Sequence, residues 1–180
     1  MAPTETKKAE EPKAGPPQLE DVKELIDAST FEQILEMDDD DDRDFSKGIV
    51  YGFFDQAETT FTKMEKALEE KKLEELSSLG HFLKGSSATL GLTNVKDGCE
   101  KIQHFGAGKD ETGSADEPDK EVSLKSIATT LKEVKVEYAK VEKFLRRYYG
   151  EELKDEEPAS ESKAEPKTEK KDESKEDAKK

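Results

Sequence analysis

Apolar residues recur three and four positions apart, without a break, in the segment from 120 to 149. They are Leu124, Ile127, Leu131, Val134, Tyr138, Val141, Leu145 and Tyr148. Because an α-helix turns once every 3.6 residues, these positions share one face, and alternating steps of three and four are typical of a helix packed in a bundle. The segment is therefore predicted to be a long helix whose apolar face must be covered by partner helices.

Three more segments with helical periodicity precede it, at about 45–70, 72–90 and 93–105. Gly91 is expected to end the second of these helices and Thr93 to cap the third. The expected inward positions are Val50, Phe53, Phe54, Ala57, Phe61, Met64 and Leu68 in the first helix, and Val95, Cys99, Ile102 and Phe105 in the third. Four long helices with mostly short connections predict an all-α fold, an antiparallel up-down-up-down four-helix bundle.

A short extra helix is predicted ahead of the bundle. A weak helical segment covers 19–27, and Thr30 is expected to cap a helix that ends at Met37 and lies across one end of the bundle. The acidic run at 38–44, DDDDDRD, lacks the spacing of a calcium-binding loop. It is predicted to be a connection in which Asp44 caps the next helix.

The two ends of the 180-residue chain differ in composition from its centre. Only 31% of the residues are hydrophobic and 42% are charged, and most of the polar excess lies in 1–18 and 151–180. Segments so poor in large apolar side chains bury too little surface to offset the entropy lost on ordering. Both are predicted to be disordered tails around one domain at 19–150.

Charge and cysteine content narrow the class of protein. A net charge of −15 argues against nucleic acid as the main partner, since phosphates would be repelled. The single cysteine, Cys99, excludes an internal disulfide and is expected to be a buried core residue. No apolar run reaches the length of a membrane span, and no signal peptide is visible. These observations predict a soluble intracellular protein with no membrane partner.

The stretch HFLKGSSATLG contains one of the two histidines of the chain, His81. When the helix at 72–90 is wound at about 100° per residue, Leu76, Leu79, Leu83 and Leu90 form the core face, and His81 lies roughly 160–170° from it. The imidazole is therefore predicted to be exposed. Its neighbours on that face are expected to be the small residues Ser77, Ser78, Gly85 and Ala88.

Gly85 distinguishes this histidine from an incidental one. A glycine inside a helix costs about 0.5–1 kcal/mol relative to alanine, and on an exposed face it gains no packing in return. It does let another protein approach the ring, while Lys84 supplies a positive charge. Imidazole is a good nucleophile near neutral pH. The pattern predicts that His81 accepts a phosphoryl group.

The segment HFLKGSSATLGL resembles the His-x-x-Lys-Gly-Ser-Ser signature of histidine-containing phosphotransfer (HPt) domains. With MDDDDDRDFSKG, FFDQAETTF and CEKIQHFG, the resemblance is to the monomeric fungal phosphorelay intermediates and covers about 29–149. In that resemblance His81 matches the phosphorylated histidine, Lys84 the lysine near the phosphate, and Gly85 the glycine that admits the partner. Gln103 matches a glutamine that orients the imidazole. In the best-known fungal member a basic residue follows the glycine that matches Gly106, whereas this chain has Ala107 there, with Lys109 two positions later.

The resemblance implies a carrier in a phosphorelay that serves stress or osmotic signalling. The phosphoryl group would come from the receiver-domain aspartate of a hybrid histidine kinase and pass to the receiver aspartate of a response regulator. It implies a monomer that binds no cofactor, because the receiver supplies Mg²⁺. The sequence has no phosphate-cradling glycine-rich loop and no set of kinase motifs, so ATP is not expected to be a substrate. The resemblance also implies a location in the cytoplasm and the nucleus.

A docking surface beside His81 is predicted from large apolar residues that lie off the core stripes, namely Ile34, Met37, Phe45 and Ile49. Ser77, Ser78 and Ala88 are expected to extend this surface along the helix of His81. An alternative is that the apolar residues pack against one another and hold the short helix in place.

Two other classes of function stay open at this point. A dimerisation and phosphoacceptor domain of a histidine kinase is also a helical bundle bearing a histidine, but it would need a second apolar seam. A plain helical scaffold would leave Gly85 without an explanation. His104 lies outside the signature and is not expected to be phosphorylated.

Overall fold

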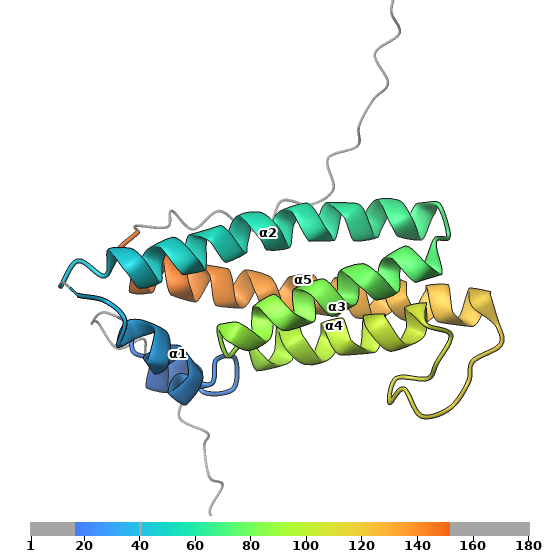
Figure 1. The fold of residues 1–180 in the computed structure, drawn as a ribbon, viewed down its shortest axis with the longest axis horizontal. Coiled ribbons are helices and arrows are strands. Elements are labelled where there is room, and N and C mark those ends of the chain that lie inside the picture. The colour runs from blue at the N-terminus through green and yellow to red at the C-terminus, as the bar shows by residue number, and fades with distance from the viewer. Residues whose placement is uncertain (1–16, 40, 152–180) are drawn as a thin grey trace, which may run out of the picture.

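The computed structural model describes residues 17–39 and 41–151, and the predicted tails lie mostly outside these ranges. The chain forms η1 (Leu19–Val22), α1 (Ala28–Leu35), α2 (Asp44–Glu69), α3 (Leu73–Thr89), α4 (Thr93–Gly106) and α5 (Lys120–Tyr148). Helices α2 to α5 run alternately in opposite directions, and α1 lies at the end of the bundle where α2 begins (Figure 1). The predicted all-α, antiparallel four-helix bundle is confirmed.

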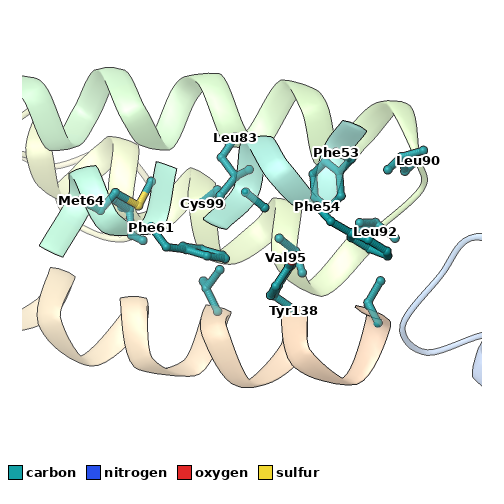
Figure 2. Packing of buried hydrophobic residues seen from close by; sticks show 14 of the residues in the cluster. Phe53, Phe54, Phe61, Met64, Leu83, Leu90, Leu92, Val95, Cys99 and Tyr138 are labelled. Atoms are coloured by element: carbon teal, nitrogen blue, oxygen red, sulfur yellow. The ribbon is translucent and has the colours of Figure 1, made fainter. Parts of the chain in front are cut away.

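The core is built from the apolar stripes of the four long helices. The seven predicted positions of α5 from Leu124 to Leu145 are buried, and Tyr148 is partly buried. Figure 2 shows Phe61, Leu83, Cys99 and Tyr138, one from each long helix, gathered in the space between them. Leu68, Leu79 and Phe105 are only partly buried, so they lie at the edges of the core.

The ends of α1 and α2 differ from the prediction. Asp27, not Thr30, caps α1: its carboxylate accepts a hydrogen bond from the Ser29 amide at 3.0 Å. The segment at 19–27 holds only one short 3₁₀ helix, η1, because the Asp27 amide donates to the Gly91 carbonyl and turns the chain onto the bundle.

Asp44 is the first residue of α2 and not its cap. The preceding residue, Arg43, has a left-handed backbone with φ of 55°. The acidic run contributes to this helix end through Asp38, whose carboxylate accepts a hydrogen bond from the Ser46 amide at 2.8 Å. The hydrogen bond at this helix end thus comes from a residue on the far side of the loop, and the sequence next to the helix does not indicate it.

Helix α4 also begins without the predicted cap. Thr93 is its first residue, and Leu92 precedes it with no side-chain cap. Gly91, with φ of +70°, follows α3 as predicted, and a Cβ there would lie 2.8 Å from the Asp27 carbonyl oxygen. A glycine is therefore required both for the backbone turn and for the close approach of the segment before α1.

At the C-terminal end, Tyr148 and Tyr149 close the bundle. Tyr148 packs edge-on against Phe31 of α1, and the Tyr149 hydroxyl lies 2.9 Å from the Ser46 hydroxyl. Glu151 bonds to Tyr51 and pairs with Arg146, so the packed chain extends at least one residue past the predicted boundary.

Helices α3 and α4 approach each other so closely that their backbones are in contact. A Cβ on Gly80 would lie 2.8 Å from both the Cys99 carbonyl oxygen and the Gln103 nitrogen. A Cβ on Gly106 would lie 2.5 Å from the Ser77 nitrogen. These two glycines fix the spacing of the pair at the level of the main chain.

Gly80→Val should therefore destabilise the bundle by about 2–3 kcal/mol, because backbone atoms cannot move aside as a flexible side chain can. Thermal or urea unfolding measures the effect. The matched control is Gly52→Val, an interior helical glycine whose Cβ would meet no atom within 4 Å. Equal stability of the two variants would contradict the proposed backbone contact.

Candidate functional site

His81 lies on the exposed face of α3, as predicted. The buried residues of this helix include Leu76 and Leu83, on the opposite side. Neither of two pockets found among residues 17–39 and 41–151 is lined by His81. The exposed ring is thus presented on an outward-facing surface, where another macromolecule can reach it.

Gln103 is held beside this part of α3 by main-chain contacts. Its backbone nitrogen faces Gly80, the residue before His81, and its carbonyl oxygen accepts a hydrogen bond from the Ser77 hydroxyl at 2.8 Å. The side-chain oxygen of Gln103 is buried and has no hydrogen-bond partner within the described part of the chain. The structure therefore places the main chain of Gln103 beside the residue that precedes His81.

Lys84, one turn after His81, is not a free cation. Its ammonium lies 3.2 Å from a carboxylate oxygen of Glu100 on α4, and the two side chains are 27% and 43% exposed. This contact was missed from the sequence because it joins two helices. On α3, Lys84 follows His81 by three residues, and on the antiparallel α4, Glu100 precedes Gln103 by three. Lys84 therefore lies opposite Glu100, as the residues around His81 lie opposite Gln103.

Gly85 leaves the approach to His81 open. A Cβ built at this position would meet no atom within 4 Å, and the residue is exposed. The next hydroxyl along the helix, that of Ser86, lies 3.3 Å from the Gln56 side-chain oxygen of α2. Helix α2 thus borders the open area on one side, and α4 borders it on the other.

The residues predicted to form a docking surface differ in exposure. Met37 is 58% exposed and Phe45 46% exposed, whereas Ile49 is partly buried. Ile34 was placed wrongly: it is only 7% exposed, because α1 packs this side of its helix against the bundle. The alternative of mutual packing therefore holds for Ile34 but not for Met37 or Phe45.

On α3, Ser78 and Ala88 are exposed as predicted, but Ser77 is partly buried with its hydroxyl bonded to α4. The sequence reading also missed Phe82, which follows His81 and is 50% exposed. Its phase could have revealed it, since it lies off the core face by the same winding that exposes His81. We refer to Met37, Phe45 and Phe82 together as the exposed apolar group.

His104 is a structural residue. Its Nδ1 lies 2.9 Å from the Glu111 carbonyl oxygen, so this nitrogen donates the hydrogen bond. The ring also packs against Gly113, where a Cβ would lie 2.9 Å from Nε2. In the same loop Lys109 pairs with Asp116. These contacts hold the loop that follows α4.

Cys99 is fully buried in the core, as predicted, and burial raises the pKa of its thiol to about 12. At pH 8, iodoacetamide should therefore modify the folded protein at least about a hundredfold more slowly than the unfolded protein, because only the thiolate reacts. Mass spectrometry of samples with and without guanidinium checks this. Equal rates would show that the core opens readily around α4.

Two other kinds of feature would bear on function, a cluster of metal ligands and a membrane-spanning helix. Among residues 17–39 and 41–151, no cluster of three or more histidine, cysteine or acidic side chains could hold a metal ion. Within the same ranges, no helix combines the length and the apolar character that a bilayer crossing needs.

Comparison with known proteins gives consistent similarities. A family model described as the Hpt domain matches residues 49–137. The multistep phosphorelay regulator 1 of Schizosaccharomyces pombe is 50% identical over 127 residues, which cover 71% of this chain and 43% of that protein. The phosphorelay intermediate protein YPD1 of Saccharomyces cerevisiae is 54% identical over 84 residues, 46% of this chain and 50% of that protein. The chain thus spans about half the length of these relatives, or less.

The matches to solved structures cover a larger share of the other chain than the matches to these relatives do. The crystal structure of yeast Ypd1p is 34% identical, with a TM-score of 0.62, and the match covers 72% of this chain and 96% of that one. A co-crystal structure contains the histidine phosphotransfer signalling protein Ypd1 and the receiver domain of its downstream response regulator Ssk1. There the identity is 37%, the TM-score 0.63 and the coverage 72% and 97%.

Proposed function

Since this chain belongs to the family of histidine-containing phosphotransfer domains, we propose that it is a phosphorelay intermediate that carries a phosphoryl group on His81. The observation that supports this most directly is an exposed imidazole next to a glycine with open space around it. The relatives are phosphorelay proteins, and one of them binds the receiver domain of a response regulator.

The transfer step needs only a nucleophile and a leaving group held in line. The unprotonated ring nitrogen of His81 attacks the phosphorus of a receiver aspartyl phosphate. The N–P bond forms as the bond from phosphorus to the aspartyl oxygen breaks, and the receiver carboxylate leaves with that electron pair. The other ring nitrogen keeps its proton. Donation to the next receiver is the same step in reverse.

The residues around His81 have separate roles in this proposal. The buried side-chain oxygen of Gln103 is available to accept a hydrogen bond from the protonated ring nitrogen and so to orient the ring. Lys84 offers a positive charge to the phosphoryl oxygens. Mg²⁺, which neutralises charge on a transferring phosphoryl group, would be held by the receiver.

The exposed apolar group is the proposed centre of the surface that binds receivers. Three exposed large side chains, Met37, Phe45 and Phe82, come from three parts of the chain and leave His81 accessible. We propose two partners in turn, the receiver of a hybrid histidine kinase and that of a response regulator. The monomeric state, the location in cytoplasm and nucleus and the role in osmotic stress stay predictions.

Incubation with a phosphorylated, radiolabelled receiver domain tests this function. We expect label to move to the protein within minutes, and no label to be gained from ATP alone. Labelling by ATP without a receiver, together with a dimer in sedimentation, would favour the phosphoacceptor domain of a histidine kinase. Absence of label in both reactions would contradict the carrier function.

A further inference from the structure

Glu100 is a charged residue of the site for which the phosphoryl chemistry described above gives no role. It lies on α4, and its carboxylate is paired with the one cation expected to contact the phosphoryl group, Lys84. The nearby lysines of α4 have other partners: Lys96 pairs with Asp97, and Lys101 with Glu111. Lys84 therefore has two possible anionic partners, the Glu100 carboxylate, which is always present, and a phosphoryl group, which is present only when His81 is phosphorylated.

The antiparallel arrangement of α3 and α4 keeps this carboxylate close to the reacting histidine. Gly80 and Gly106 hold the two backbones in contact, and Gln103 lies against the residue before His81. One turn further along both helices, Lys84 meets Glu100. Because the spacing is set by main-chain atoms, Glu100 cannot move away with a displaced helix when His81 gains a charged group.

We propose that Glu100 competes with the phosphoryl group for Lys84 and thereby raises the tendency of phosphorylated His81 to give the group up. This rests on the proposed carrier function. In the unphosphorylated protein the ammonium is paired with Glu100. A phosphoryl group on His81 adds negative charge one turn away, and the same ammonium cannot neutralise both anions fully. The carboxylate left with a weaker partner then disfavours the phosphorylated state.

Glu100→Gln should consequently shift the phosphoryl equilibrium with a receiver toward His81. The amide keeps the size of the side chain but removes its charge, so Lys84 can serve the phosphoryl group alone. We expect a shift of about fivefold in the ratio of labelled carrier to labelled receiver, the upper range for a partly exposed ion pair. In 1 M salt, which screens charges beyond about 3 Å, most of this shift should disappear.

Two further variants separate this role from a general effect of charge. Glu65→Gln removes one negative charge from another pair between helices, that with Lys135 of α5, and should leave the equilibrium unchanged. In a Lys84→Gln background, Glu100→Gln should shift the equilibrium by less than about twofold, because the shared cation is gone. Thermal melting of each variant confirms that the fold is kept.

Three results would overturn the inference while the carrier function stands. They are a shift no larger than that of Glu65→Gln, a shift toward the receiver, and an equal shift in the Lys84→Gln background. The second would mean that Glu100 holds Lys84 in position for the phosphoryl group. Failure of the wild-type protein to take label would instead overturn the carrier function, and this inference with it.

Discussion

His81→Gln should abolish phosphoryl acceptance and leave the melting temperature within about one degree of the wild type. The side chain is exposed, and no hydrogen bond or ion pair involves its ring among the described residues, so little stability depends on it. Glutamine has similar reach but no nucleophilic nitrogen. Label transfer from a phosphorylated receiver, measured beside thermal melting on the same preparation, checks both parts.

His104→Gln is the natural control for this experiment. It removes the only other histidine, which is bonded to the loop after α4, so the variant should keep its label even if its stability falls. If label persists in His81→Gln, or disappears only in His104→Gln, then His81 is not the residue that accepts the phosphoryl group.

Gly85→Gln should slow transfer at least about tenfold without loss of stability. Replacing a glycine inside a helix raises helix stability by up to about 1 kcal/mol, and a Cβ at this position meets no atom within 4 Å. The new side chain would stand one turn from His81, in the space through which the receiver aspartate must approach. Because the imidazole itself is unchanged, most of the loss should appear as weaker receiver binding.

Ala139→Gln provides the matched control, since it adds an equivalent side chain at an exposed position of α5. It should transfer phosphoryl at the wild-type rate. The idea that Gly85 admits a partner fails if Gly85→Gln also transfers at that rate. A marked loss of stability in Gly85→Gln would show instead that this face of α3 is covered.

The sequence predicts the four long helices to within about one or two residues because their apolar periodicity is sustained over many turns. It does not predict how α1 and α2 begin. Asp27 caps α1 while its amide bonds to Gly91, and Asp38 bonds across a loop to Ser46. Such contacts depend on how distant segments meet, and a local preference for threonine or aspartate cannot reveal them.

The candidate site shows the same division. The exposure of His81 and the open space at Gly85 follow from helical phase alone. The pairing of Lys84 with Glu100 and the burial of Ile34 do not, since each depends on the distance between two packed helices. Phase within a helix is periodic and readable, whereas the choice of partner across a helix interface is a property of the assembled bundle.

The outward-facing position of His81 has a consequence for the flow of signal. In the proposed relay, one nucleophile on one surface cannot contact a donor and an acceptor at once, so the two receivers would exclude each other and bind in sequence. The rate of phosphoryl transfer would then be limited by how fast each receiver dissociates, and very tight binding by either receiver would slow the relay. The relative abundance of the competing receivers, together with their affinities for this surface, would decide how a shared supply of phosphoryl groups is divided.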